Sequence, residues 1–287
     1  MPASPQELVE LLDLETIDLN LFRGRQPDTL LQRVFGGQVA AQALVAASRT
    51  VEDRVEIHSM HSYFLRPGDT AVPIVYDVDR VRDGRSFTTR RVLARQHGRP
   101  IYALTASFHV AEEGFEHQDR MPDVPSPEES TDLTSLVLQD SARREEWERE
   151  WSVLDLRRAA DSLPGGQFEH GEQVSRVSYW IRVRPTLPDD VLVHRAALTY
   201  VSDMTLLGAT LVLHGEYPTS ATMQAASLDH TVWFHRPYRA DEWLLYDQTS
   251  PSAAGARGLA FGRLFTQDGR LVASVAQEGL IRPRRDR

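Results

Sequence analysis

The sequence contains no lysine and no cysteine. All 32 basic residues among its 287 are arginine. Without lysine, the chain cannot be a Schiff-base enzyme and cannot carry a P-loop of the GK[ST] type. Without cysteine, it has no disulfide, no thiolate nucleophile, and no cysteine-ligated zinc or iron–sulfur cluster. These two absences exclude several classes of enzyme.

Other signals are missing too. Acidic residues outnumber basic ones 41 to 32, which argues against a general nucleic-acid binder. The first 22 residues hold no basic residue, unlike a signal peptide, and no apolar run approaches the roughly 20 residues of a spanning helix. G-x-S-x-G, H-E-x-x-H and G-x-G-x-x-G motifs and an acidic calcium loop are absent. We expect a cytoplasmic protein with no membrane span, no metal and no cofactor.

What the sequence does contain is an internal repeat. YFLRP is followed by YD in the first half, and WFHRP is followed by YD at the same spacing in the second. A third match, RQHGR with TQDGR, follows in the same order, which indicates a duplicated chain. The matching segments are residues 63–67, 76–77 and 95–99 in the first half and residues 233–237, 246–247 and 266–270 in the second.

Each half has the same predicted layout of one helix followed by strands. The first helical stretch, residues 39–47, is small and apolar on nearly every face, which is typical of a helix enclosed by protein. The second runs over residues 196–213. Turn signals at residues 82–85 and 97–100 separate strands. The predicted strands are residues 58–65, 74–81, 86–96 and 101–110, and then 223–235, 243–249, 256–266 and 271–281. This pattern predicts a sheet wrapped around a buried helix, twice.

We expect an N-terminal unit over residues 1–111, a polar connector over residues 112–173, and a C-terminal unit over residues 174–287 that carries the catalytic residues. Within the connector, residues 122–127 (PDVPSP) are predicted to be loop. Residues 140–151, rich in Arg and Glu, are predicted to form a solvent-exposed helix with i,i+4 charge pairs and no catalytic role. The triplet FEH occurs at residues 115–117 and 168–170; polar turns are preferred there over a metal site.

Asp203 is the only charged residue between Ala196 and Leu213. A carboxylate in such a setting must be paired or hydrogen-bonded. Composition favours a capping role, with Ser202 and Asp203 as N-cap candidates for a helix that starts at Met204. The alternative is a general base, or an anchor for a hydrolytic water.

Four other polar residues lie among apolar strand residues. His61 and His230 occur near the repeated motifs, and core histidines with satisfied hydrogen bonds are preferred over acid–base groups. Ser227 and Gln277, taken in isolation, are interpreted as strand residues that face solvent. Their spacing does not place them beside Asp203.

Several motifs together resemble the acyl-CoA thioesterase II family. They are FGGQ (35–38), HSMHSYFLRPGD (58–69), DGRSF (83–87), YVSD (200–203), SLDH (227–230), WFHRP (233–237) and VAQEG (275–279). The resemblance covers nearly the whole chain and is weaker over residues 126–173. It implies an α+β double hotdog, in which two tandem units each wrap an antiparallel sheet around a long central helix. It also implies hydrolysis of medium- to long-chain fatty acyl-CoA to free fatty acid and CoA.

In that family an Asp, a Thr or Ser, and a Gln jointly hold and activate water. By resemblance these roles fall on Asp203, Ser227 and Gln277, the predicted catalytic residues. A thioester is electrophilic enough for a positioned water, so no acyl-enzyme is needed. Backbone N–H groups near Asp203, or near Gly36 and Gly37, are candidate oxyanion donors.

Two other functions stay open: a hotdog hydratase or dehydratase with a His or Glu base, and a non-catalytic acyl-CoA-binding protein. The resemblance also suggests a homo-oligomer, a dimer or tetramer. Because lysine is absent, side-chain binding of CoA phosphates falls to arginine. Candidates by position are Arg66, Arg236, Arg257 and Arg263, with ordinary surface ion pairing as the alternative for each.

Overall fold

The computed structural model describes residues 1–137, 141–163, 166–168 and 175–284. In that part of the chain, the strands form one 14-stranded sheet. Its order is β1-β2-β4-β5-β6-β3-β11-β14-β13-β12-β9-β8-β7, and β10 pairs with β14 outside this path. Every neighbouring pair is antiparallel.

The first half of the chain forms one side of this sheet and one central helix. Its elements are α1 (Pro5–Leu12), β1 (Glu15–Asp18), β2 (Leu21–Gly24), α2 (Gly36–Ser48), β3 (Val55–Phe64), β4 (Ile74–Asp83), β5 (Phe87–Gln96) and β6 (Arg99–Val110). The tight β5–β6 connection uses positive φ at His97 (48°) and Gly98 (71°), which suits a two-residue hairpin turn. The predicted turn at residues 97–100 is confirmed.

The second half repeats the arrangement. Its helical elements are α3 (Leu133–Val137), α4 (Ser141–Trp151), α5 (Val191–Ser202) and the 3₁₀ helix η1 (Leu206–His214). Its strands are β7 (Thr131–Asp132), β8 (Leu154–Asp161), β9 (Ser175–Val183), β10 (Met223–Ser227), β11 (Asp229–Phe234), β12 (Leu244–Ala254), β13 (Arg257–Thr266) and β14 (Leu271–Pro283). The order β2-β4-β5-β6-β3 matches β9-β12-β13-β14-β11, so the predicted duplication is confirmed.

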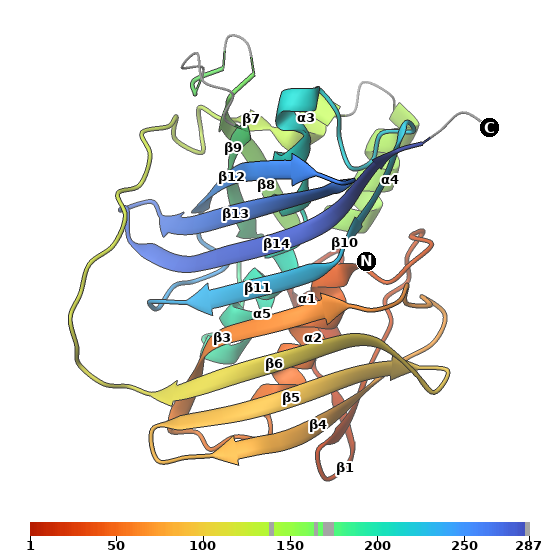
Figure 1. The fold of residues 1–287 in the computed structure, drawn as a ribbon, viewed down its shortest axis with the longest axis vertical. Helices are drawn as coiled ribbons and strands as arrows, with labels where there is room; N and C mark the ends of the chain where they lie inside the picture. The colour runs from red at the N-terminus through yellow and green to blue at the C-terminus, as the bar shows by residue number, and fades with distance from the viewer. Residues whose placement is uncertain (138–140, 164–165, 169–174, 285–287) are drawn as a thin grey trace.

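The two halves join through one strand pair and one helix pair. Strand β3 pairs with β11, which makes the sheet continuous, while α2 and α5 lie behind the sheet and pack against each other (Figure 1). Residues 37–47 of α2 are all buried, as expected for a helix without a polar face. The structure is an α+β double hotdog, and that prediction is confirmed.

Two predicted elements are interrupted in the structure, and several strands were not predicted. The stretch over residues 196–213 is not one helix: α5 ends at Ser202, and η1 begins at Leu206. The strand over residues 223–235 is interrupted at Leu228 between β10 and β11. Strands β1, β2, β7, β8 and β9 were not predicted. Both helix and strand are interrupted where they approach Asp203.

The connector is more structured than its polar composition indicates. Residues 111–130 run along the outside of the molecule as loop, including the predicted 122–127 (Figure 1). The segment then supplies β7, α3, α4 and β8, and β8 pairs with β9 at the sheet edge. The division of the chain at residues 111/112 and 173/174 stays a prediction, and residue 173 lies outside the described residues.

Helix α4 is exposed only in part. Asp140, its predicted first residue, lies outside the described residues. Glu150 in its last turn is buried, and its carboxylate accepts hydrogen bonds from Thr29 Oγ1 (2.5 Å) and the Leu30 N–H (2.8 Å). The predicted solvent-exposed helix is therefore confirmed over most of residues 144–149 and wrong at Glu150. Residues 115–117 lie in exposed irregular chain, as preferred; of the second FEH triplet, Glu169 and His170 lie outside the described residues.

Residues Val191–His214, which span α5 and η1, are long and apolar enough to cross a membrane by length and composition, with mean hydropathy 1.5. The expectation that no such run exists is wrong. Inside the protein, 72% of this stretch's most apolar window is buried, because α5 lies in the core behind the sheet.

Candidate active site

Asp203 lies at the end of α5 and caps no following helix. It is the C-cap of α5, and the N-cap of η1 is Thr205. The predicted N-cap role is therefore wrong. Its carboxylate instead accepts hydrogen bonds from elsewhere in the chain: Gln277 Nε2 at 2.5 Å and Ser227 Oγ at 3.3 Å, both to Oδ1, and the Gly37 N–H.

The three predicted catalytic residues therefore meet. Ser227 is the last residue of β10, where it lies opposite Gly279 of β14. Gln277 precedes Gly279 by two positions on β14 and so faces the same side of the sheet. Gln277 is fully buried and Ser227 is half-buried, so the interpretation of both as solvent-facing strand residues is wrong.

The start of α2, from the other half of the chain, also borders the site. A Cβ on Gly36 would lie 2.4 Å from Asp203 Oδ2, and one on Gly37 would lie 2.1 Å from the Tyr200 carbonyl oxygen. Only glycine allows α2 to approach the end of α5 this closely. The Gly37 N–H donates to Asp203. It is therefore not free to bind an oxyanion, which was one of the two predicted roles for backbone N–H groups.

Burial governs the ionisation of Asp203. Removal from water raises its pKa from 3.8 to about 6, and the hydrogen bonds from Gln277, Ser227 and Gly37 hold the pKa below what burial alone would give. The phenols of Tyr102 on β6 and Tyr246 on β12 interact with the Asp203 charge, and burial raises the pKa of both. At neutral pH the site therefore holds one carboxylate whose pKa lies close to the surrounding pH.

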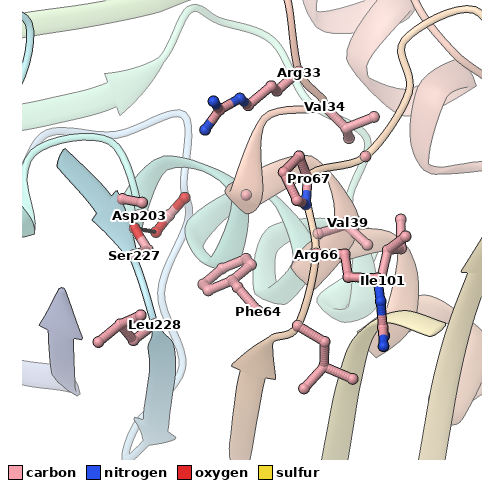
Figure 2. Close-up of a pocket in the computed structure, with 14 residues that line it drawn as sticks. Arg33, Val34, Val39, Phe64, Arg66, Pro67, Ile101, Asp203, Ser227 and Leu228 are labelled. Carbon is pink, nitrogen blue, oxygen red and sulfur yellow. Dashed lines mark hydrogen bonds between the residues drawn. The ribbon is translucent and has the colours of Figure 1, made fainter. Parts of the chain in front are cut away.

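Asp203 and Ser227 line a pocket of about 260 Å³ between the two halves. Figure 2 shows both on one side of it, with Phe64 and Val39 facing them. The remaining wall is mostly apolar, and Arg33 and Arg66 are the only charged side chains besides Asp203 among the described residues that line it. The full lining is Arg33, Val34, Gly36, Val39, Phe64, Leu65, Arg66, Pro67, Gly68, Ile101, Asp203, Ala226, Ser227 and Leu228.

Of the four predicted phosphate-binding arginines, the structure places only Arg66 at this pocket, where its Nη1 also donates to the Pro100 carbonyl (2.7 Å). Arg236 donates to the carbonyls of Leu271 and His117. Arg257 pairs with Glu278 at 3.0 Å, and Arg263 pairs with Asp119 and Asp247. The last three therefore have structural partners.

Arg33 is a pocket residue that the sequence analysis missed. It is exposed, lines the pocket, and has no hydrogen bond or ion pair among the described residues. The one available signal was its position, two residues before the FGGQ motif at the start of α2.

The two repeat-related histidines differ. His230 is fully buried with Nε2 2.9 Å from Ser202 Oγ, and burial lowers its pKa to about 3. The core location is therefore confirmed for His230, but the expectation of satisfied hydrogen bonds is not, because Nδ1 has no partner among the described residues. His61 is exposed and meets the Trp233 ring edge-on at 5.3 Å, so the core prediction is wrong there. Among the described residues, no group of three or more His, Asp or Glu side chains could hold a metal ion.

Duplication also produces a second pocket of about 530 Å³ between the end of α2 and the start of α5. There Ile57 lies opposite Phe108, as Ser227 lies opposite Gly279. The position that corresponds to Gln277 is Ala106. This second pocket, which we call the N-terminal pocket, therefore lacks the hydroxyl and the amide of the Asp203 site.

A double hotdog with a buried carboxylate held by a hydroxyl and an amide, beside an apolar pocket, defines a class of site suited to hydrolysis by water. Comparisons with known proteins identify the family. Residues 156–280 match the acyl-CoA thioesterase family, and residues 26–109 match the acyl-CoA thioesterase N-terminal domain. This chain belongs to the acyl-CoA thioesterase family.

Individual relatives match along nearly the whole chain. Human acyl-coenzyme A thioesterase 8 is 41% identical over 95% of this chain and 88% of its own length. Acyl-CoA thioesterase 2 of Haemophilus influenzae is 41% identical over 96% of both chains. The crystal structure of the acyl-CoA thioesterase II TesB2 from Mycobacterium marinum is 46% identical, with a TM-score of 0.83 over 96% of this chain and 98% of that one.

Proposed function

We propose that this protein hydrolyses acyl-CoA thioesters to free acid and CoA by direct attack of a water molecule that Asp203 activates. The observation that carries the proposal is the Asp203 carboxylate. It is buried, it has a pKa of about 6, it is held by Ser227 and Gln277, and it opens on an apolar pocket. Relatives that match 95% and 96% of this chain are named acyl-CoA thioesterases.

The reaction uses groups already in place. Asp203 accepts a proton from the water as the water oxygen attacks the thioester carbonyl carbon. Ser227 and Gln277 hold the carboxylate and the water in the orientation needed for attack, which lowers the entropic cost of the attack. The tetrahedral intermediate then expels the CoA thiolate, and the proton on Asp203 is available to the leaving sulfur. No covalent enzyme intermediate forms.

The substrate class follows from the pocket lining. Val34, Val39, Phe64, Ile101 and Leu228 offer an apolar surface to an acyl chain. The guanidinium groups of Arg33 and Arg66 lie at the same pocket and suit the phosphates of CoA. We propose medium- to long-chain fatty acyl-CoA, to be tested by kcat/KM over saturated chains from acetyl to palmitoyl. A maximum at acetyl-CoA would contradict it.

The two other functions have less support. A hydratase or dehydratase normally uses a His or Glu base, and neither residue type is among those that line the described pocket. The purified protein should be incubated with palmitoyl-CoA and a thiol reagent, and separately with crotonyl-CoA. CoA release from palmitoyl-CoA supports the thioesterase. Crotonyl-CoA hydration without CoA release would indicate a hydratase, and binding without either reaction would indicate a carrier.

Assembly and location are further proposals. We propose a homo-oligomer, a dimer or tetramer, formed through the outer face of the sheet. Tyr63, Trp233 and Phe261 are exposed there on β3, β11 and β13, and exposed aromatic surface is typical of an interface. Light scattering on the purified protein tests this, and a monomer at micromolar concentration would contradict it. Cytoplasmic localisation stays a prediction.

A further inference from the structure

Three buried polar atoms close to Asp203 have no hydrogen-bond partner among the described residues: the Tyr102 hydroxyl and two side-chain atoms on β14 and β11. The latter two are Oε1 of Gln277 and Nδ1 of His230. Both side chains are fully buried, so neither atom can bond to bulk water. Buried polar atoms are nearly always paired, and two unpaired atoms near one site need an explanation.

Strand register makes these two residues neighbours. Thr231 of β11 lies opposite Ala276 of β14. Continuing this register by one position, beyond the last pair that the ladder forms, would place His230 next to Gln277. Both side chains are buried on the inner face of the sheet, where directly opposed side chains have Cβ atoms roughly 4.5–5.5 Å apart.

The Nε2 atoms of both side chains contact Asp203 or the residue next to it. Gln277 Nε2 donates to Asp203 Oδ1 at 2.5 Å. His230 Nε2 lies 2.9 Å from Oγ of Ser202, the residue before Asp203. The Ser202 hydroxyl has one proton and two acceptors within reach, His230 Nε2 and the Thr199 carbonyl at 3.1 Å, and the shorter contact is to His230.

We propose that His230 is a positioning residue that fixes the orientation of the Gln277 amide. The neutral imidazole carries its proton on Nδ1 and donates it to Gln277 Oε1, while Nε2 accepts the Ser202 proton. In the structure the two atoms lie outside hydrogen-bonding geometry, and a rotation of the imidazole that closes this one bond would satisfy both. With Oε1 held, the Gln277 NH₂ must face Asp203, and a rotated amide, which would turn its oxygen toward the carboxylate, is prevented.

This inference rests on the proposed function, because the Gln277–Asp203 bond serves the hydrolysis. It predicts that His230 acts on the pH dependence of the reaction through Gln277. Loss of the Gln277 donor removes a bond to the ionised form of Asp203, which raises the Asp203 pKa. The other titratable groups that face Asp203 are the Tyr102 and Tyr246 phenols, and the permanently charged Arg33 lines the same pocket.

Two matched variants separate positioning from packing. In His230→Asn the amide nitrogen occupies about the place of Nδ1, whereas in His230→Gln it occupies about the place of Nε2. We expect His230→Asn to keep the wild-type acid limb of kcat/KM, with kcat lowered by no more than about threefold. We expect His230→Gln to lower kcat about tenfold and to move the acid limb up by about one pH unit, as Gln277→Leu does. KM should change little.

A wild-type acid limb in folded His230→Gln, or equal losses in both variants, would overturn the proposal. A measurement on the wild type needs no variant to fold: two-bond ¹H–¹⁵N correlation of ¹⁵N-histidine-labelled protein from pH 5 to pH 8. We expect a non-titrating imidazole in the Nδ1–H form. His194, also buried, accepts the Ala240 N–H on Nδ1 at 3.0 Å and so has the Nε2–H form. If every non-titrating imidazole has the Nε2–H form, the proposal fails, whereas failure of the proposed function would appear as no CoA release by the wild type.

Discussion

The Asp203 carboxylate is under two opposed influences. Burial disfavours its charge, while the donors from Gln277, Ser227 and Gly37 favour the charge. The result is a pKa of about 6, which is high enough for a useful base and low enough for ionisation at neutral pH. The same donors fix the position of the oxygen that must accept the proton.

The pH dependence of activity follows from this pKa. Asp203 must be ionised to accept a proton, so activity is present above its pKa and is lost as the pH falls through it. We expect kcat/KM for palmitoyl-CoA to rise tenfold per pH unit at low pH and to level off above about 6. A profile between pH 4.5 and 8.5 in buffers of constant ionic strength checks this. A flat profile down to pH 4.5 would contradict it.

Ser227 and Gln277 act on one carboxylate oxygen and one water, so their contributions are coupled. We expect Ser227→Ala and Gln277→Leu each to lower kcat by roughly ten- to a hundredfold, and the double variant to lose much less than the product of the two. A double-mutant cycle with palmitoyl-CoA measures this coupling. Full multiplicativity of the two losses would show that the residues do not share a water.

At the residue scale, the sequence predicted which residues form the site better than it predicted the surroundings of their side chains. The resemblance to a family placed Asp203, Ser227 and Gln277 together, whereas composition favoured a helix cap and solvent-facing strand residues. The reason is that the contacts depend on the pairing of β10 with β14, which joins residues about 50 positions apart. Local pattern carries no information about that register.

At the scale of elements, the site depends on the contact between the start of α2 and the end of α5. Gly36 and Gly37 remove the side chains that would hold the helices apart. The break after Ser202 places the Asp203 carboxylate at the start of the neighbouring helix. The apolar run over residues 196–213 conceals this break, because its residues favour a helix and only tertiary contacts end it.

Gly36→Ala tests the helix contact. Alanine would raise helix propensity by up to about 1 kcal/mol, but its Cβ would lie 2.4 Å from Asp203 Oδ2 and 2.9 Å from the Phe64 ring. We expect displacement of Asp203 and a loss in kcat of at least about tenfold. The control is Gly208→Ala in η1, where the nearest atom to the new Cβ is 3.9 Å away. Equal activity of both variants would contradict this account.

At the scale of the whole molecule, duplication supplied two pockets and one complete site. The Asp203 site takes one wall from each half of the chain: α2 and β3 from the first, α5 and β10 from the second. The N-terminal pocket has Ile57 where the active one has Ser227. Its lining carries one guanidinium, that of Arg195, against the carboxylates of Glu52, Asp53, Glu56, Asp189 and Asp190. These charges would repel the phosphates of CoA.

We therefore expect one acyl-CoA site per chain. Titration calorimetry with a non-hydrolysable thioether analogue of palmitoyl-CoA should give one equivalent bound per chain, because the N-terminal pocket presents negative charge to a polyanion. Two equivalents of similar affinity would show that the N-terminal pocket also accepts the substrate.

The overall architecture was the most predictable feature. The repeated motifs and the enclosed helix predicted two units, and the strand order bears this out. Among the strands that were not predicted, β8 has an identifiable physical reason. The Arg and Asp residues of β8 interrupt the apolar pattern that would predict a strand. Ion pairs with the neighbouring strand allow these residues in the sheet: Asp155 of β8 pairs with Arg182 of β9 at 2.8 Å.

Turnover of palmitoyl-CoA by Asp203→Asn tests the central claim most directly. We expect kcat to fall by about 10²- to 10⁴-fold while the thermal unfolding transition persists, because the variant keeps the shape of the side chain and loses the base. Asp229→Asn is the matched control: Asp229 accepts the Glu278 N–H outside the pocket, and the variant keeps that acceptor. Near-normal CoA release by folded Asp203→Asn would contradict the account.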